Sequence, residues 1–299
     1  MNAIEIRNLS KSFRGMYAVD NLNMTVPQGA IYGFIGENGS GKSTTEKLIC
    51  GHLVPDGGVI KLFGKDYTDA GVRARVGALI ENAGCFPSSS VRANLMMQAL
   101  NLGLENRDEQ IDRVLKIVRM EDSARIKFKS CSLGMKQRVG IAMALLGDPA
   151  LLILDEPING LDTDGMAIMR EILVDITKNL GCTVLISSHI LGELEKIATH
   201  YGIIRQGRMI QELSADQMDA RSRVFVSLKT RDMQGAKRVL ENKFNAVREE
   251  QGYLRVYDTD DVEGIVKCLM LSGHAVSEIK KNKVGLEEYY VSLMSKKEA

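Results

Sequence analysis

The stretch GENGSGKST, residues 36–44, gathers glycines, one lysine and hydroxyl side chains between an apolar run and a helical pattern. Residues 36–43 fit the pattern G-x-x-x-x-G-K-[ST]. The glycines let the backbone fold into a nest of N–H groups that point at phosphate oxygens, and the following helix adds its positive end. In such a loop Lys42 reaches the β- and γ-phosphates of ATP and Ser43 ligates Mg²⁺. The predicted ATP-binding residues here are Gly36, Glu37, Asn38, Gly39, Ser40, Gly41, Lys42, Ser43 and Thr44.

A second chemical feature is LLILDEP, residues 151–157, an apolar strand that ends in two carboxylates. Ligands of open parallel sheets collect at the carboxyl ends of the strands. We expect Asp155 to hold Mg²⁺ through water and Glu156 to act as general base toward the attacking water. A strand that ends in an acidic turn is common by itself, so it is the pairing with the phosphate loop that favours ATP hydrolysis.

The bulk composition limits the class of protein. The chain has 299 residues, is 44% apolar, and carries 39 basic and 38 acidic residues for a net charge of +1. This balance gives no general attraction to nucleic acid or anionic lipid. Five scattered cysteines without a C-x-x-C pair indicate reduced thiols. No apolar stretch approaches the roughly 20 residues that span a bilayer, and the charged start does not match a signal peptide. We therefore expect no membrane span and a soluble protein.

The order of the elements predicts an α/β fold with two domains. Strand and helix patterns alternate around the phosphate loop and again after residue 150, which indicates a parallel sheet with right-handed crossovers. Residues 82–147 form a helical region between them, and we place domain 1 at residues 1–214. A small α/β domain of short strands and helices follows at residues 215–299, with no predicted site. The expected helices of the helical region are Val91–Leu104, Arg107–Arg119 and Met135–Leu146.

Five motifs in order resemble the ATP-binding subunit of ABC transporters. They are the phosphate loop, SLGMKQR (132–138), LLILDEP (151–157), NGLD (159–162) and SSH (187–189). The resemblance covers about residues 3–212 and implies a P-loop NTPase fold, with a mixed sheet core and a helical subdomain. SLGMKQR and VGALIEN (76–82) look most like ATPases of bacitracin and lantibiotic export or immunity.

The resemblance assigns a trans role to the signature loop, which caps the γ-phosphate of ATP bound to the other subunit. This loop departs from the commoner S-G-G-Q, because Leu133 and Met135 stand in place of Gly and Gln. Its hydroxyl and N–H groups at a helix start suit an anion, although an ordinary helix start would look the same. The residues matched to the signature are Ser132, Leu133, Gly134 and Met135.

Four other positions receive roles from the resemblance alone. It implies that His189 is the switch residue that contacts the γ-phosphate, and that Asp162 lies in the loop that crosses the dimer seam. Phe13 matches the aromatic residue that stacks on adenine, although a single Phe is more often a core residue. Glu81 stands where most members have Gln, and its expected role is a metal-linked coupling residue. A solvated glutamate at a strand end is the simpler alternative.

The resemblance also implies partners. One copy carries half of each site, so two ATP-binding subunits, most simply a homodimer, would enclose two ATPs head to tail. A separate integral membrane permease would dock on the helical region near residues 82–95, on the cytoplasmic face of the membrane. We expect no nucleic-acid partner. Two alternatives stay open from the sequence: a soluble ABC ATPase that acts on DNA or ribosomes, and a module that senses nucleotide without turnover.

Overall fold

The structure, a computed structural model, describes residues 1–221, 224–250 and 252–295. The chain divides into two compact units, Met1–Ala215 and the residues from Asp216 onward, and each is described by itself. Unit 1 contains both motifs that the sequence associates with phosphate. Among the described residues, no helix is both long and apolar enough to cross a membrane.

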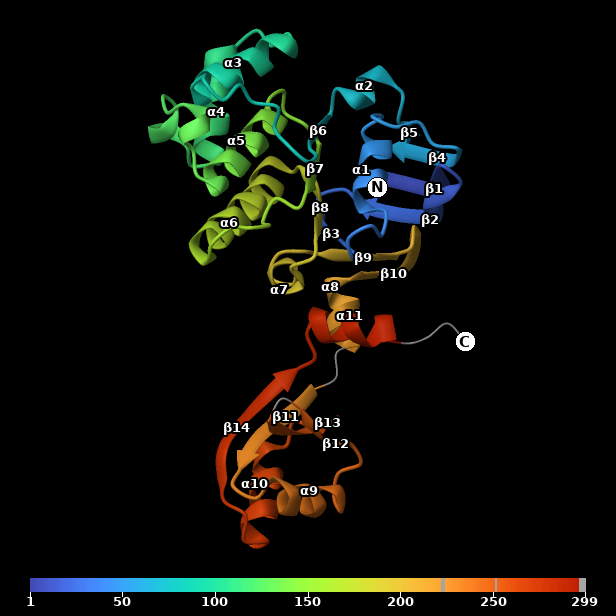
Figure 1. Cartoon of the computed structure of the whole chain (residues 1–299), viewed down its shortest axis with the longest axis vertical. Coiled ribbons are helices and arrows are strands. Elements are labelled where there is room, and N and C mark those ends of the chain that lie inside the picture. The colour runs from blue at the N-terminus through green and yellow to red at the C-terminus, as the bar shows by residue number, and fades with distance from the viewer. Residues whose placement is uncertain (222–223, 251, 296–299) are drawn as a thin grey trace. The chain divides into compact units, whose positions relative to one another are not determined.

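A six-stranded mixed sheet forms the centre of unit 1 (Figure 1). Counted in spatial order from β6, the first five strands pair in parallel, and the sixth, β10, pairs antiparallel with β9. The strands β3, β7 and β8 are buried along nearly their whole length, as expected of strands covered on both faces, although β8 carries three hydroxyl side chains. In spatial order the strands are β6 (Val76–Leu79), β7 (Leu151–Asp155), β8 (Thr183–Ser188), β3 (Ile31–Ile35), β9 (His200–Arg205) and β10 (Arg208–Ser214).

An antiparallel sheet packs beside this central sheet. A hairpin turn with left-handed backbone at Arg14 and Gly15 joins its two long strands. One apolar cluster includes Ile4 and Ile60 of this sheet and Phe34 of the central sheet, together with Leu48 of helix α1 (Lys42–Ile49). The phosphate-loop helix is therefore anchored in the core. The four strands, in spatial order, are β2 (Met16–Pro27), β1 (Asn2–Phe13), β4 (Gly57–Leu62) and β5 (Lys65–Asp66).

The helices α3, α4 and α5 gather on the side of the central sheet away from the antiparallel sheet (Figure 1). The expected helices in this region are present with shifted ends. The first stops at Asn101, because Gly103 takes a left-handed backbone. The third begins at Leu133, since Ser132 caps it. The helices of unit 1 after α1 are α2 (Ala70–Arg73), α3 (Val91–Asn101), α4 (Arg107–Ile117), α5 (Leu133–Leu145), α6 (Thr163–Leu180) and α7 (Leu191–Leu194), with 3-10 turns at Glu121–Ser123 and Phe128–Ser130.

Unit 2 has the element order β-α-β-β-α-β, the split βαβ arrangement of ferredoxin-like folds. Its sheet runs β12-β13-β11-β14 with every pair antiparallel. Helices α9 and α10 supply Leu240 and Leu269 to the apolar cluster on the sheet. The elements are α8 (Ala215–Arg221), β11 (Val224–Thr230), α9 (Met233–Glu241), β12 (Val247–Glu250), β13 (Tyr253–Tyr257), α10 (Val262–Leu271), β14 (Val276–Lys283) and α11 (Leu286–Ser295).

Candidate functional site

The loop between β3 and α1 is too tightly folded for side chains at two of its glycines. A Cβ on Gly36 would lie 2.4 Å from the hydroxyl oxygen of Ser40 and 2.6 Å from the carbonyl oxygen of Ile204. Gly41 has φ +107, and a Cβ there would lie 2.4 Å from the carbonyl oxygen of Ala18. The backbone can take this curled path only because these positions carry no Cβ. This is the loop geometry that a phosphate-binding nest requires.

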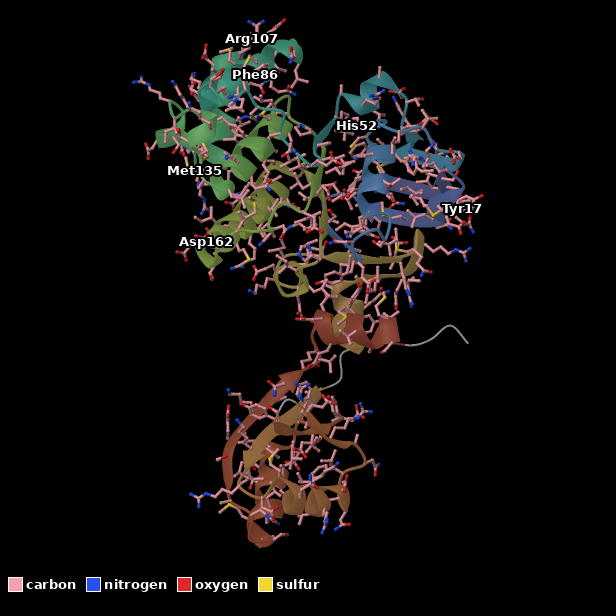
Figure 2. The ribbon with its side chains drawn as sticks, in the orientation of Figure 1. Tyr17, His52, Phe86, Arg107, Met135 and Asp162 are labelled. Atoms are coloured by element: carbon pink, nitrogen blue, oxygen red, sulfur yellow. The ribbon has the colours of Figure 1, made fainter. Side chains whose placement is uncertain are left out.

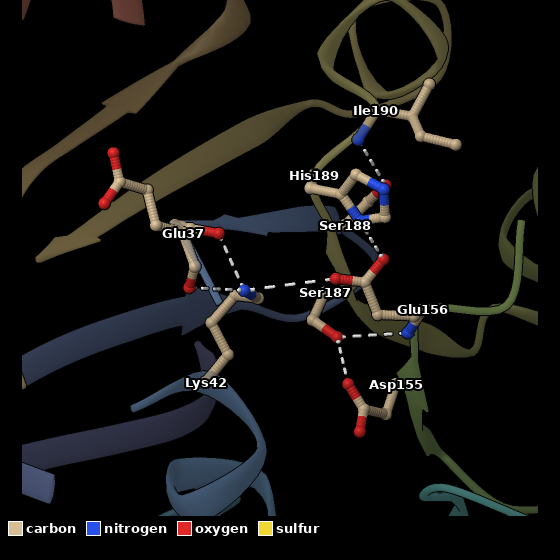
Figure 3. A network of polar contacts seen from close by, with 9 residues as sticks. Glu37, Lys42, Asp155, Glu156, Ser187, Ser188, His189 and Ile190 are labelled. Carbon is tan, nitrogen blue, oxygen red and sulfur yellow. Dashed lines mark hydrogen bonds and ion pairs between the residues drawn. The ribbon is translucent and has the colours of Figure 1, made fainter. Parts of the chain in front are cut away.

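Lys42, the first residue of α1, turns its ammonium group back over the loop (Figure 3). Its Nζ donates hydrogen bonds to the carbonyl oxygens of Gly36, at 2.7 Å, and Glu37, at 3.1 Å. The carboxylate of Glu156 lies 3.9 Å away on the other side. Lys42 is 6% exposed, so this cation is held in a partly dehydrated position where an anionic phosphate would be strongly attracted.

The carboxylates predicted at the end of β7 lie beside the end of β8. The strands pair in parallel with Asp155 opposite Ser187, so the residues that follow both strands share one edge of the sheet. Glu156 Oε2 lies 2.6 Å from His189 Nδ1, and Ser187 Oγ donates a 2.8 Å hydrogen bond to Asp155 Oδ1 (Figure 3). The structure therefore brings Lys42, Asp155, Glu156 and His189 together.

The donor set at this edge fits a magnesium ion. Asp155 Oδ1 accepts from the hydroxyl of Ser187, and Ser43 stands in the first turn of α1. Among the described residues, no group of three or more His, Cys, Asp or Glu side chains could hold a metal ion by itself. One hydroxyl and one carboxylate are what Mg²⁺ uses when substrate phosphates and water complete its shell. The phosphate oxygens of ATP would lie in the adjoining loop.

Sequence analysis missed a third carboxyl group in this region, Glu46. Its side chain is fully buried, and its carboxyl group interacts with Ser187 and Asp155. Burial, and secondly the charge of Asp155, raises the pKa of Glu46 to about 8. The same carboxyl adds to burial in raising the pKa of the Cys50 thiol to about 12. The available signal was its spacing, since Glu46 lies one helical turn after Lys42 on the buried side of α1.

The signature residues lie at the start of α5 and do not belong to the group formed by Lys42, Asp155, Glu156 and His189. Ser132 caps α5 by accepting a hydrogen bond from the backbone N–H of Met135, at 3.2 Å. Asp162 caps α6 in the same way through Gly165, at 2.8 Å. Met135 and Asp162 lie on one side of unit 1, away from Tyr17 in the β1–β2 hairpin (Figure 2). A cavity of about 390 Å³ between the two helix starts is lined by Ser132, Leu133, Gly134, Arg138, Gly160, Leu161, Asp162, Asp164, Gly165, Ile168 and Met169.

Two further predicted residues, Phe13 and Glu81, have contacts outside the group formed by Lys42, Asp155, Glu156 and His189. Phe13 ends β1 and is 45% exposed, with the ammonium of Lys11 5.6 Å from the ring centre. Glu81 has a left-handed backbone, φ +64, and its carboxylate lies 2.6 Å from the ammonium of Lys47 in α1. This hydrogen bond holds the pKa of Glu81 below its ordinary value. Glu81 is thus connected to the phosphate-loop helix by an ion pair, while its side chain remains 63% exposed just after the end of β6.

Comparisons with known proteins agree with the motif order. The ABC transporter family matches residues 19–159. The bacitracin transport ATP-binding protein BcrA of Bacillus licheniformis is 36% identical over 297 residues, which are 97% of each chain. The lantibiotic transport ATP-binding protein SrtF of Streptococcus pyogenes is 37% identical over 222 residues, covering 74% of this chain and 95% of SrtF.

Solved structures share the fold of unit 1. The cbiO1 protein of Clostridium perfringens, part of the ABC transporter complex cbiONQ, has a TM-score of 0.67 and 29% identity, over 74% of this chain and 91% of that one. A dimeric post-hydrolysis state of the ATP-binding cassette MJ0796, bound to ADP and Pi, has a TM-score of 0.65 at 21% identity, over 71% of this chain and 98% of that one. The second likeness is one of fold.

The buried Glu46 carboxyl predicts a pH-dependent stability. Unfolded, the group ionises near its ordinary pKa of 4.5, whereas the folded protein keeps the proton until about pH 8. The unfolded state therefore binds fewer protons between these values, and stability falls as pH rises from about 4.5 to about 8. The charged groups facing Glu46 are Asp155 and Lys42. In Glu46→Gln we expect this fall, on the order of a few kcal/mol, to disappear.

The measurement is the midpoint of thermal unfolding between pH 5 and pH 8, with EDTA and without nucleotide. Glu195→Gln, which changes an exposed glutamate, is the control and should keep the wild-type profile. Parallel pH profiles for wild type and Glu46→Gln would show that Glu46 does not hold a proton in the folded chain.

Proposed function

The chain belongs to the ABC transporter family as an ATP-binding, ATP-hydrolysing subunit, and on that premise we propose that it drives a separate membrane permease for export of, or immunity to, an antimicrobial peptide such as bacitracin. The observation that carries the cargo class is the match to BcrA over 97% of both chains. The match to SrtF spans 222 residues, close to the length of unit 1. Unit 2 is thus part of what this chain shares with the bacitracin relative.

The relatives reported above are named as transport proteins, so they give no support to the alternative of an ATPase acting on DNA or ribosomes. The presence of Lys42, Glu156 and His189 at one edge of the sheet also argues against a sensor without turnover. We place the protein on the cytoplasmic face of the membrane, held there by the permease. The dock that we propose is the segment of residues 82–95, which includes the exposed Phe86.

In the proposed reaction each residue at the phosphate edge has one task. The loop N–H groups and Lys42 bind and orient the phosphates of ATP. Ser43 and Asp155 would hold Mg²⁺, which neutralises phosphate charge when it is bound. Glu156 accepts a proton from the attacking water, and His189, at 2.6 Å, orients the Glu156 carboxylate. Phe13 would offer its exposed ring to adenine.

We further propose that the active form is a homodimer. The signature residues Ser132, Leu133 and Gly134 line a cavity with Asp162, and the N–H of Met135 donates to the Ser132 cap of α5. A second copy related by two-fold symmetry would bring its signature cavity to the phosphate loop of the first. Two such sites would close together, and loss of the γ-phosphate would release them.

Glu81 enters this proposal as a carboxylate balanced by Lys47. A negative charge near this site would weaken the binding of ATP and strengthen the binding of Mg²⁺. The adjacent ammonium of Lys47 offsets that negative charge. Because Lys47 belongs to α1, movement of VGALIEN would be transmitted to the phosphate-loop helix. This gives the coupling role a physical route through the chain.

The first prediction concerns Glu156. Glu156→Gln removes the proton acceptor but keeps the shape of the side chain, so ATP should still bind while kcat falls by roughly 100-fold or more. Size-exclusion chromatography with light scattering should then detect an ATP-bound dimer. Glu195→Gln, an exposed change, should turn over like wild type. Full ATPase activity in Glu156→Gln would refute the assignment of the base.

The second prediction concerns Glu81. Glu81→Gln removes one negative charge near the metal, so the Mg²⁺ concentration for half-maximal ATPase activity should rise roughly two- to fivefold. Lys47→Met should shift it in the opposite direction. ATPase titrations with Mg²⁺ at fixed ATP test both changes. An unaltered Mg²⁺ dependence together with unaltered transport would leave Glu81 without the coupling role.

The third prediction tests the cargo. Co-expression of the chain with the polytopic protein of its neighbouring reading frame should raise the bacitracin resistance of a sensitive bacterium at least fourfold. Lys42→Ala, which removes the phosphate-binding cation, should abolish the increase. Unchanged bacitracin tolerance despite ATP hydrolysis would disprove the cargo class while leaving the ATPase assignment intact.

A further inference from the structure

Ser187 is a fully buried hydroxyl at the carboxyl end of β8, between the phosphate-loop strand and the carboxylate strand. Phe34 of β3 pairs with it on one side and Asp155 of β7 on the other. Its side chain is 0% exposed. Resting on the proposed function, we propose that Ser187 is a positioning residue for ATP hydrolysis, which holds the metal-binding carboxylate of Asp155 and the backbone of the base Glu156 in one arrangement.

The hydroxyl group makes both connections at once (Figure 3). Ser187 Oγ donates to Asp155 Oδ1 at 2.8 Å and accepts from the backbone N–H of Glu156 at 3.1 Å. A serine has a single O–H donor, so a hydroxyl that gives its proton to Asp155 keeps its lone pairs for the N–H. The two bonds therefore fix each other, and their direction assigns Asp155 Oδ1 to the hydroxyl of Ser187.

Glu156 needs such support because its backbone is strained. Its φ is +51, in the left-handed region that disfavours residues with a Cβ. The N–H of Glu156 is shared between the hydroxyl of Ser187 at 3.1 Å and the carbonyl oxygen of Ser187 at 3.2 Å. Strain at a reacting residue persists when the surroundings determine the conformation. Here it aims the carboxylate of Glu156 at His189, at 2.6 Å.

The neighbouring polar groups do not provide this connection. Ser188, the next residue, accepts from the N–H of Ile190 at 3.0 Å and so holds the turn that follows the strand. Glu46 is buried nearby and its carboxyl group interacts with the side chains of Ser187 and Asp155, whereas the described partners of the Glu156 N–H are both atoms of Ser187. Ser187 is thus the residue through which the conformations of Asp155 and Glu156 depend on each other.

The test compares Ser187→Thr with Ser187→Val in the full-length chain. These side chains have nearly the same shape, so their difference isolates the hydroxyl from added volume. We expect Thr to keep kcat within about threefold of wild type and Val to lower it roughly tenfold to hundredfold. Affinity for ATP without Mg²⁺, measured by direct titration, should stay within about twofold, whereas the gain in affinity on adding Mg²⁺ should shrink in Val.

Two further variants guard against a structural explanation. Ser187→Ala adds no volume, so it replaces Ser187→Val in the comparison if that variant folds poorly. We expect it to show the same loss of kcat. Thr183→Val removes a buried hydroxyl from the opposite end of the same strand, where it accepts from Gly29 N–H at 3.0 Å, and should keep wild-type kcat. Equal kcat and equal Mg²⁺ response in Ser187→Ala and Ser187→Thr would overturn the inference.

Failure of the proposed function gives a different result. If the wild-type chain does not hydrolyse ATP, or if Glu156→Gln retains full activity, the base assignment fails whatever Ser187 does. If wild type is active, Glu156→Gln is inactive, and the Ala and Thr variants of Ser187 are alike, only the positioning role is lost.

Discussion

The parallel register of three neighbouring strands is the constraint on which this site depends. Strands β3, β8 and β7 all run in one direction, so their carboxyl ends meet at one edge of the sheet. The phosphate loop follows the first strand, His189 follows the second and Glu156 follows the third. A shift of one residue in the β7–β8 pairing would move Asp155 off Ser187 and turn alternate side chains to the other face. The burial of these strands on both faces fixes that register.

The charged and polar groups around Lys42 explain why this edge of the central sheet attracts an anion. Lys42 is nearly buried, and it is engaged by two loop carbonyl oxygens and by a carboxylate at 3.9 Å. These partners stabilise the cation in surroundings that favour neutral groups. A phosphate would offer the ammonium a full opposing charge in place of carbonyl dipoles.

Two acidic groups that contact the phosphate-loop helix or belong to it distinguish this site further. Glu46 occupies a core position where burial opposes its ionisation, and Glu81 approaches the same helix from β6 through Lys47. Both place acidic groups around a region that also has to accept phosphate and metal. The chain balances them differently, since Glu46 holds its proton up to about pH 8 and Glu81 is neutralised by a lysine. Charge near the metal is thus adjusted by local partners.

The sequence by itself determined the parts that are local in the chain: the phosphate loop, the two carboxylates after an apolar strand, and the motif order that identifies the family. Its periodicity also predicted the helices of residues 82–147, with ends displaced where caps and left-handed glycines decide the boundary. Such features depend on neighbours within one helical turn or one strand, and residue types reveal them.

The tertiary structure alone decided which remote residues meet. Ser187 bridges Asp155 and Glu156 because β7 and β8 pair in register, and Lys47 reaches Glu81 because α1 packs near the end of β6. Glu46 is unusual only because its helix is anchored in the core, and Ser132 shares a cavity with Asp162 only because the starts of α5 and α6 lie together. No spacing in the chain encodes these distances, since they arise from strand order and from which faces are buried.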